Sequence, residues 1–195
     1  MTKTILAKYQ REPVWRARHQ LLQNQLSTEL ATWLFDSSSL TERMILACDG
    51  SFSVQVLSQG WSRAMLNEAR VLRMRTGRRA LVREVHLLCN NVPWIFARTV
   101  IPPHTLKGKL RRLAKLGKKP LGAVLFADKS MERTEMEIAC IEPGQQLYQS
   151  ATRHMAASNQ PIWGRRSVFY LNRHPLMVSE VFLPQIGKPK HRCIK

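Results

Sequence analysis

The sequence of 195 residues has no long apolar run and few cysteines. No stretch approaches the roughly 20 apolar residues of a membrane-spanning helix, and the N-terminus has no apolar segment followed by a small-residue cleavage site. These absences predict a cytoplasmic protein. The cysteines lack the paired spacing of a tetrahedral metal site, so we expect no metal centre. We expect reduced thiols at all four positions, Cys48, Cys89, Cys140 and Cys193.

Acidic residues are also scarce, because 13 Asp and Glu stand against 31 Lys and Arg, a formal charge of +18. Such an excess is typical of nucleic-acid binders, yet no zinc-finger spacing or aromatic-rich RNP sequence accompanies it. We therefore expect no specific nucleic-acid partner. Peripheral attraction to an anionic membrane stays open. So does the alternative that the chain is a basic protein that binds nucleic acid or anionic surfaces and has no catalytic activity.

Two segments hold much of the positive charge. Seven basic residues lie within 107–119, and four more form a tail at Lys188, Lys190, Arg192 and Lys195. In the first segment, leucines recur at helical spacing, which predicts an amphipathic helix over 105–116 with Thr105 as its N-cap and a basic outer face. A solvated face, an anionic substrate, an acidic membrane and nucleic acid are all compatible with that pattern.

The strand and turn signals predict one α+β domain over residues 1–195. With 44% hydrophobic residues, the chain is long enough for a sizeable core. Alternating apolar positions predict six strands, at 51–57, 79–89, 94–101, 134–141, 167–171 and 176–183. Asn90 and Asn91 favour a tight reversal, and Ser39 with Glu42 forms a capping box that opens a helix ending near Ala47. Because no βαβ pattern occurs, we expect an antiparallel sheet with helices to one side.

Two charged residues, Arg83 and Glu180, fall on apolar strand faces. Their neighbours at alternate positions are Leu81, Val85 and Leu87 for Arg83, and Leu176, Val178 and Phe182 for Glu180. Burying either charge alone would cost several kcal/mol, so each needs a partner, water or a ligand. Either the two residues pair with each other, or both face a ligand site.

Other charged and titratable residues allow two interpretations each. Arg98 also lies among apolar strand neighbours, where it would serve as a second carboxylate anchor or as part of a structural ion pair. Arg165 and Arg166 favour structural or flap roles. His86 falls on the strand face opposite Arg83, and His174 lies in a turn, so we leave both histidines out of the site.

Five short motifs resemble the bacterial chorismate pyruvate-lyases, in that family's order, over roughly residues 38 to 184. They are Leu-Val-Arg-Glu-Val at 81–85, Pro-Trp at 93–94 with Ala-Arg-Thr-Val-Ile-Pro at 97–102, Leu-Gly-Lys-Lys-Pro-Leu-Gly at 116–122, Trp-Gly-Arg-Arg-Ser at 163–167 and Ser-Glu-Val-Phe-Leu-Pro at 179–184. The resemblance implies a single domain with a six-stranded antiparallel sheet and helical flaps over an enclosed ligand site. The basic tail at 185–195 lies beyond it.

The resemblance also implies an activity and its residues. A lyase of this family converts chorismate into 4-hydroxybenzoate and pyruvate without a cofactor, in ubiquinone biosynthesis. Arg83 would bind the ring carboxylate, and Glu180 would contact the hydroxyl at the opposite end of the ring, as base or as orienting group. Leu121 would contribute a flap contact. Leu40 lies where the family commonly has methionine, so its ligand contact has a different shape.

Further expectations follow from that match. A pocket built for a ring carboxylate and a para hydroxyl also fits the product, so we expect product inhibition. We expect a monomer. As an alternative, the same fold would act as a ligand-sensing effector domain without catalysis, as in a class of bacterial transcription regulators. A winged-helix segment would then precede the domain, and we expect the first 36 residues to be too short for one.

Overall fold

One antiparallel sheet forms the centre of the protein in this computed structural model, which describes residues 12–20, 26–156 and 158–186. The strands are β1 (Arg16–Ala17), β2 (Phe52–Arg63), β3 (Arg79–Cys89), β4 (Val92–Ile101), β5 (Met131–Arg133), β6 (Glu137–Ile141), β7 (Ile162–Leu171) and β8 (His174–Phe182). Their order is β1-β6-β7-β8-β4-β3-β2, and β5 also pairs with β7. The α+β prediction is confirmed, but the sheet has eight strands rather than six. The two additional strands are β1 and β5, too short to give a periodic signal.

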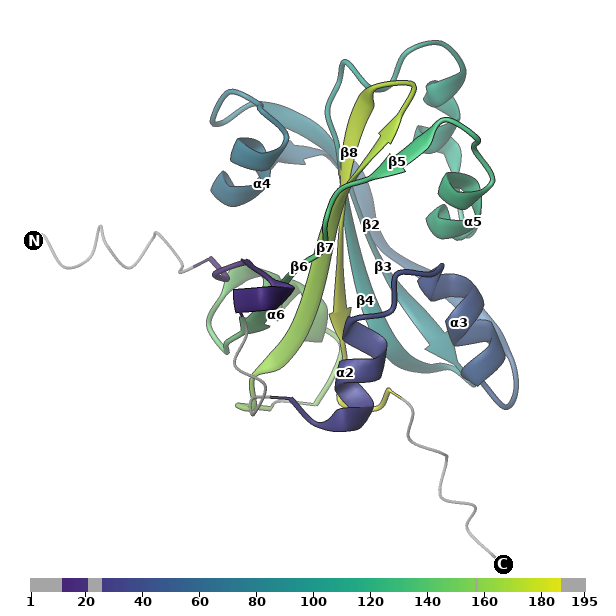
Figure 1. The fold of residues 1–195 in the computed structure, drawn as a ribbon, viewed down its shortest axis with the longest axis vertical. Coiled ribbons are helices and arrows are strands. Elements are labelled where there is room, and N and C mark those ends of the chain that lie inside the picture. Colours follow the sequence, from purple (N-terminus) through teal and green to yellow (C-terminus); the bar gives the residue numbers. More distant parts are fainter. Residues whose placement is uncertain (1–11, 21–25, 157, 187–195) are drawn as a thin grey trace, which may run out of the picture.

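Helices cover both faces of this sheet. They are α2 (Thr28–Leu34), α3 (Leu40–Ala47), α4 (Leu66–Val71), α5 (Leu121–Phe126), α6 (Gln146–Thr152) and the short 3₁₀ helices η1 (Arg18–Gln20) and η3 (Gly108–Lys115). Figure 1 shows α3 and α5 on one side of the strands and α4 and α6 on the other. The expectation of helices to one side was therefore wrong. Helices are needed on both sides because every residue of β3 after Arg79 is buried, so both faces of that strand must be covered.

Two tight turns set the strand registers. Asn90 and Asn91 between β3 and β4 have φ of 49° and 63°, and Asn172 and Arg173 between β7 and β8 have φ of 48° and 64°. Positive φ at both central residues gives the twist of a two-residue hairpin turn, and Asn tolerates that conformation well. The predicted reversal after β3 is confirmed. The second turn places Arg165 opposite Glu180.

Local signals around the helices gave mixed results. The capping box is confirmed, because the Ser39 hydroxyl accepts from the Glu42 N–H at 3.4 Å and α3 ends at Ala47. The helix predicted over 105–116 is instead the 3₁₀ helix η3. The hydroxyl of Thr105 donates to the Pro175 carbonyl at 2.6 Å instead of capping, and Gly108 has a φ of 51°. The backbone therefore changes direction at Gly108, and the α-helix predicted from Thr105 does not form.

A disulfide joins Cys48, directly after α3, to Cys89 at the end of β3. The expectation of reduced thiols was wrong for these two residues, because the packing of α3 on the sheet brings together positions 41 residues apart in sequence. Cys140 has no disulfide, and Cys193 lies outside the described residues. The same holds for most of the basic tail, from residue 187 on. None of the helices in the described ranges is long and apolar enough to cross a membrane.

Two apolar clusters pack on the α3–α5 face of the sheet. One joins α2 and α3 to the strands through residues such as Trp33, Met44 and Ile95. The other joins η3 and α5 to the strands through Leu113, Leu125 and other residues. Both clusters hold fully buried side chains, which stabilise the fold by removing apolar surface from water. The polar residues considered next lie between them.

Candidate active site

A cavity lies between the sheet and the helices α3 and α5. Its walls come from three central strands through Arg83, Thr99 and Glu180, and from the two helices and the residue before α5 through Leu40, Thr41, Pro120, Leu121 and Phe126. Four of the five predicted site residues therefore meet around one space: Arg83, Glu180, Leu40 and Leu121. Strand residues supply its charges, and helix residues supply most of its cover.

Arg83 is the cation of this cavity. Its side chain donates to the Gln59 side-chain oxygen at 2.9 Å and makes a long contact of 3.4 Å with the Lys119 carbonyl. Both acceptors are neutral, and no carboxylate of the described residues forms an ion pair with it. Burial lowers the pKa of Arg83, since 3% of the residue is exposed and no anion compensates. The guanidinium can therefore still receive a carboxylate.

Glu180 forms an ion pair with Arg165 on the neighbouring strand, with 2.6 Å between Oε2 and Nε. Arg165 is almost fully buried and also donates to the Trp33 carbonyl at 3.1 Å, to that of Leu34 at 3.5 Å and to that of Asp36. Arg83 and Glu180 consequently do not pair with each other, and both face the cavity. Arg165, expected to be structural or part of a flap, fixes the position of Glu180.

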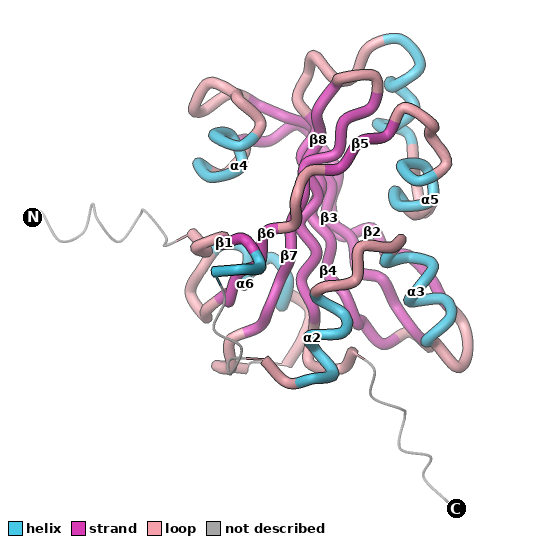
Figure 2. The backbone as a smooth tube through the Cα atoms, viewed as in Figure 1, coloured by secondary structure: helices cyan, strands magenta, loops and turns pink. Residues whose placement is uncertain are grey.

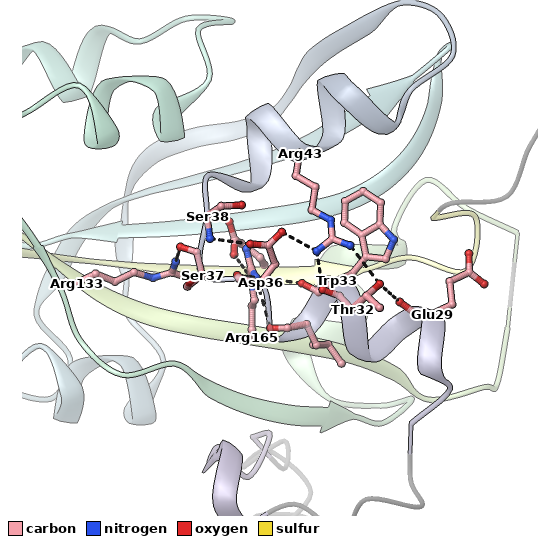
Figure 3. Close-up of polar contacts among 11 residues, drawn as sticks. Glu29, Thr32, Trp33, Asp36, Ser37, Ser38, Arg43, Arg133 and Arg165 are labelled. Atoms are coloured by element: carbon pink, nitrogen blue, oxygen red, sulfur yellow. Dashed lines mark hydrogen bonds and ion pairs between the residues drawn. The ribbon is translucent and has the colours of Figure 1, made fainter.

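The connection between α2 and α3 is held by arginines from three elements. Arg43 pairs with Asp36 at 2.6 Å, and Arg133 donates to the Ser37 carbonyl at 2.9 Å. Figure 3 shows these side chains and Arg165 around residues 36–38. Burial lowers the pKa of Arg133, with Glu180 acting in the opposite direction. These bonds fix the segment that leads into α3 and hence one end of the cover.

The two covering helices touch each other closely. A Cβ at Gly122 would lie 2.9 Å from the Thr41 hydroxyl oxygen, so this contact favours glycine. The space enclosed below is about 50 Å³. Pockets for small organic ligands usually measure roughly 300–1,000 Å³, so α3 and α5 must separate for a six-membered ring to enter. The helices α3 and α5 thus lie over the cavity, in the position expected for helical flaps.

Arg98 lies on the opposite face of the sheet, outside the cavity. It is 5% exposed and binds Glu68 through two bonds, of 2.7 and 3.0 Å, and Glu84 through one of 2.7 Å. Burial alone would lower the pKa of Arg98, but the bonds and charges of the two glutamates outweigh burial and raise it. Of the two roles considered for Arg98, this geometry matches the structural ion pair.

The remaining residues singled out in the sequence also lie away from the cavity. Arg166 binds Glu137 at 2.8 Å and Asn67 at 2.6 Å on the far face. His86 contacts the Ala151 carbonyl at 3.0 Å on that face, and His174 begins β8 beside the turn. Sequence reasoning missed Gln59 and Arg133, which carried no recognisable signal. Arg165 had one, because the two-residue turn before β8 fixes the Arg165–Glu180 register.

Solved structures similar to this chain share its fold. PhnF from Mycobacterium smegmatis aligns with a TM-score of 0.54 and 16% identity, covering 77% of this chain and 66% of that one. A GntR-family transcriptional regulator from Bacillus cereus aligns with a TM-score of 0.51 and 14% identity, covering 69% and 93%. At such identities the likeness concerns the fold alone.

Sequence comparisons are more specific. A probable chorismate pyruvate-lyase from Methylococcus capsulatus is 43% identical over 80% of this chain and 96% of its own length. A probable chorismate pyruvate-lyase from Aromatoleum aromaticum is 40% identical over 83% and 88%, and one from Pseudomonas aeruginosa is 35% identical over 89% and 92%. The family model for chorismate lyase matches residues 10–190. The chain therefore belongs to the chorismate lyase family.

Proposed function

We propose that this protein eliminates pyruvate from chorismate and releases 4-hydroxybenzoate. The observation that carries the proposal is the placement of Arg83 and Glu180 around one covered cavity with apolar walls. A ring with a carboxylate at one end and a hydroxyl at the other matches this pair of charges. Family membership supports the same reaction.

Arg83 binds the ring carboxylate in this proposal. Its planar guanidinium offers five N–H donors, and the two acceptors near it leave room for a bidentate pair. Because the residue is buried, the charge of a bound carboxylate is weakly screened and strongly attracted. Gln59 orients the guanidinium. Substrate binding then supplies the anion that burial of Arg83 requires.

Glu180 orients the ring hydroxyl. Its Oε2 is held by Arg165 at 2.6 Å, and the cavity-facing carboxylate accepts a hydrogen bond from the hydroxyl. In the reaction, the ether C–O bond to the enolpyruvyl group breaks at one ring carbon, and the neighbouring ring carbon loses its hydrogen as a proton. That proton reaches the methylene carbon of the departing group, giving pyruvate. Aromatisation drives the step, so positioning supplies much of the rate.

We further propose the setting of this reaction. The protein acts in the cytoplasm as a monomeric domain over residues 1–195, and its 4-hydroxybenzoate enters ubiquinone synthesis. Because the product keeps both the carboxylate and the hydroxyl that Arg83 and Glu180 bind, it competes with substrate. We expect an inhibition constant for 4-hydroxybenzoate near or below the Michaelis constant for chorismate, measured by steady-state kinetics. An inhibition constant far above that value would contradict the product complementarity.

The decisive experiment mixes purified protein with chorismate in chelator-treated buffer and quantifies both products together. Equal amounts of pyruvate and 4-hydroxybenzoate, formed well above the spontaneous rate, are expected. Binding of 4-hydroxybenzoate without any turnover would instead assign a ligand-binding role, like that of the ligand-binding domain of a GntR-family transcriptional regulator from Bordetella bronchiseptica, which shares the fold. Absence of both turnover and binding would leave the cavity without this function.

A further inference from the structure

The positive charge of the chain is concentrated at one end of the sheet. Residues 61–79 hold six arginines and residues 103–119 hold seven lysines and arginines. Glu68 is the single acidic residue in these two segments, and it is buried against Arg98. In Figure 1 the helices α4 and α5 mark this end, one on each side of the strands. We call these two segments the basic end.

The two segments meet in an open groove of about 680 Å³. Its cationic lining comprises Arg73, Arg75, Arg78 and Arg79, and its apolar lining includes Trp61. Half of Trp61 is exposed. These arginines are exposed, and none forms an ion pair within the part of the chain that the structure describes. An uncompensated cluster of this kind costs self-repulsion and attracts anions.

A second open groove of about 590 Å³ lies between η3 and α5. Arg112, Lys115 and Lys119 line it together with Ala123 and Val124 of α5. Phe126, on the same helix, is 37% exposed. Both grooves therefore combine cations with apolar side chains at the same end of the molecule.

We propose that the basic end docks on the surface of an anionic lipid bilayer. Lys and Arg near such a surface are attracted to its headgroups, and an exposed Trp is well suited to the boundary between headgroups and acyl chains. The apolar sides of both grooves favour lipid over nucleic acid, because aliphatic side chains such as Met74 and Val124 complement glycerol and acyl groups rather than phosphodiester. Docking places Phe126, which also lines the cavity, beside the bilayer.

The test measures co-sedimentation of the full chain with vesicles of phosphatidylcholine, with and without phosphatidylglycerol. Binding is expected only when phosphatidylglycerol is present, and raising the salt to about 1 M should release the protein because the Debye length shrinks to about 3 Å. The variant R75Q/R78Q should partition about 25-fold more weakly, since each basic residue near the surface strengthens binding about fivefold. W61S should weaken binding too, and neither change should alter lyase turnover in solution.

The matched control is R16Q/R153Q, which removes the same charge from the exposed Arg16 of β1 and the exposed Arg153 directly after α6. Neither Arg16 nor Arg153 lines either groove, and in Figure 2 β1 and α6 lie below α4, on the side of the sheet opposite α5. This variant should bind vesicles as well as the unmodified chain. Equal losses of vesicle binding in R75Q/R78Q and R16Q/R153Q would mean that net charge, not the basic end, causes binding, and this would overturn the proposal. Failure of the unmodified chain to bind vesicles with phosphatidylglycerol would overturn it too. So would a single-stranded RNA probe that binds more tightly than vesicles and depends on Arg75 and Arg78.

Discussion

The two faces of the sheet each bury an arginine in a different way. Arg83 and Arg98 lie on adjacent strands, with Arg98 directly opposite the residue that follows Arg83. Arg98 makes three hydrogen bonds to two carboxylates, whereas Arg83 reaches two neutral oxygens. A buried cation whose charge is already paired is costly to separate from its partners, and one without an anion is poised to bind one. The partners of a buried charge, more than its burial, indicate its role.

Removing Arg83, the buried arginine without an anion, should give the largest loss of activity. We expect Arg83→Ala to lower kcat/KM by roughly 10³- to 10⁴-fold, because a desolvated partner of the substrate carboxylate is lost. The free energy of unfolding should change little, since no native ion pair disappears. Steady-state kinetics and urea unfolding measure both quantities. Activity within tenfold of the unmodified protein would exclude Arg83 as the carboxylate anchor.

Removing Arg98 should have the opposite pattern. Arg98→Met leaves Glu68 and Glu84 buried without a cation, which should cost about 3–5 kcal/mol in the free energy of unfolding. Turnover per folded molecule should be unchanged, because Arg98 lies outside the cavity. The triple variant R98M/E68Q/E84Q should recover part of the lost stability in urea titrations. A selective loss of kcat/KM with unchanged stability would place Arg98 in the active site after all.

The two faces also differ in the use of their carboxylates. Glu180→Gln should slow kcat by about tenfold, because the amide oxygen still accepts from the hydroxyl but its pairing with Arg165 is lost. Glu84→Gln on the far face is the matched control and should leave kcat unchanged. If Glu180→Gln lost more than about 10³-fold, Glu180 would be the proton acceptor rather than an orienting group.

The smallest effect concerns His86 on the far face. Burial lowers the pKa of His86 below its ordinary value of 6.5, partly opposed by the bond to the Ala151 carbonyl. The unfolded chain therefore binds a proton more readily, and stability is lost as pH falls below about 6.5, by at most about 1.4 kcal/mol per pH unit. His86→Gln should flatten this dependence in urea titrations at several pH values. The exposed His104→Gln should not, and a flat profile in the unmodified chain would contradict the role of His86.

Sequence patterns predicted the pocket better than its supporting contacts. Alternation along β3 and β8 placed Arg83 and Glu180 correctly on inward faces, because a strand's period of two is simple to follow. The partners of these residues depend on other strands. Gln59 reaches Arg83 across the β2–β3 pairing, which contains a bulge, and Arg133 comes from a strand of three residues. Neither contact follows from local periodicity.

The fold showed the same division between local and distant information. The α3 capping box was predictable because it depends on residues three apart. The 3₁₀ geometry of η3 was not, since Thr105 is engaged by Pro175 from a hairpin 70 residues away. Cys48 and Cys89 likewise had no local spacing signal. Each of these contacts depends on tertiary packing.

The disulfide limits how the cover of the cavity can move. It fastens the C-terminal end of α3 to the end of β3, whereas Leu40 and Thr41 lie at the N-terminal end of that helix. A lift of the whole helix from the sheet would break a covalent bond. Any movement of α3 that opens the cavity is therefore limited to a swing about Cys48, with its largest displacement where Thr41 meets Gly122. Chemical reduction of the Cys48–Cys89 disulfide would remove that pivot, and α3 would then be held on the sheet by packing alone.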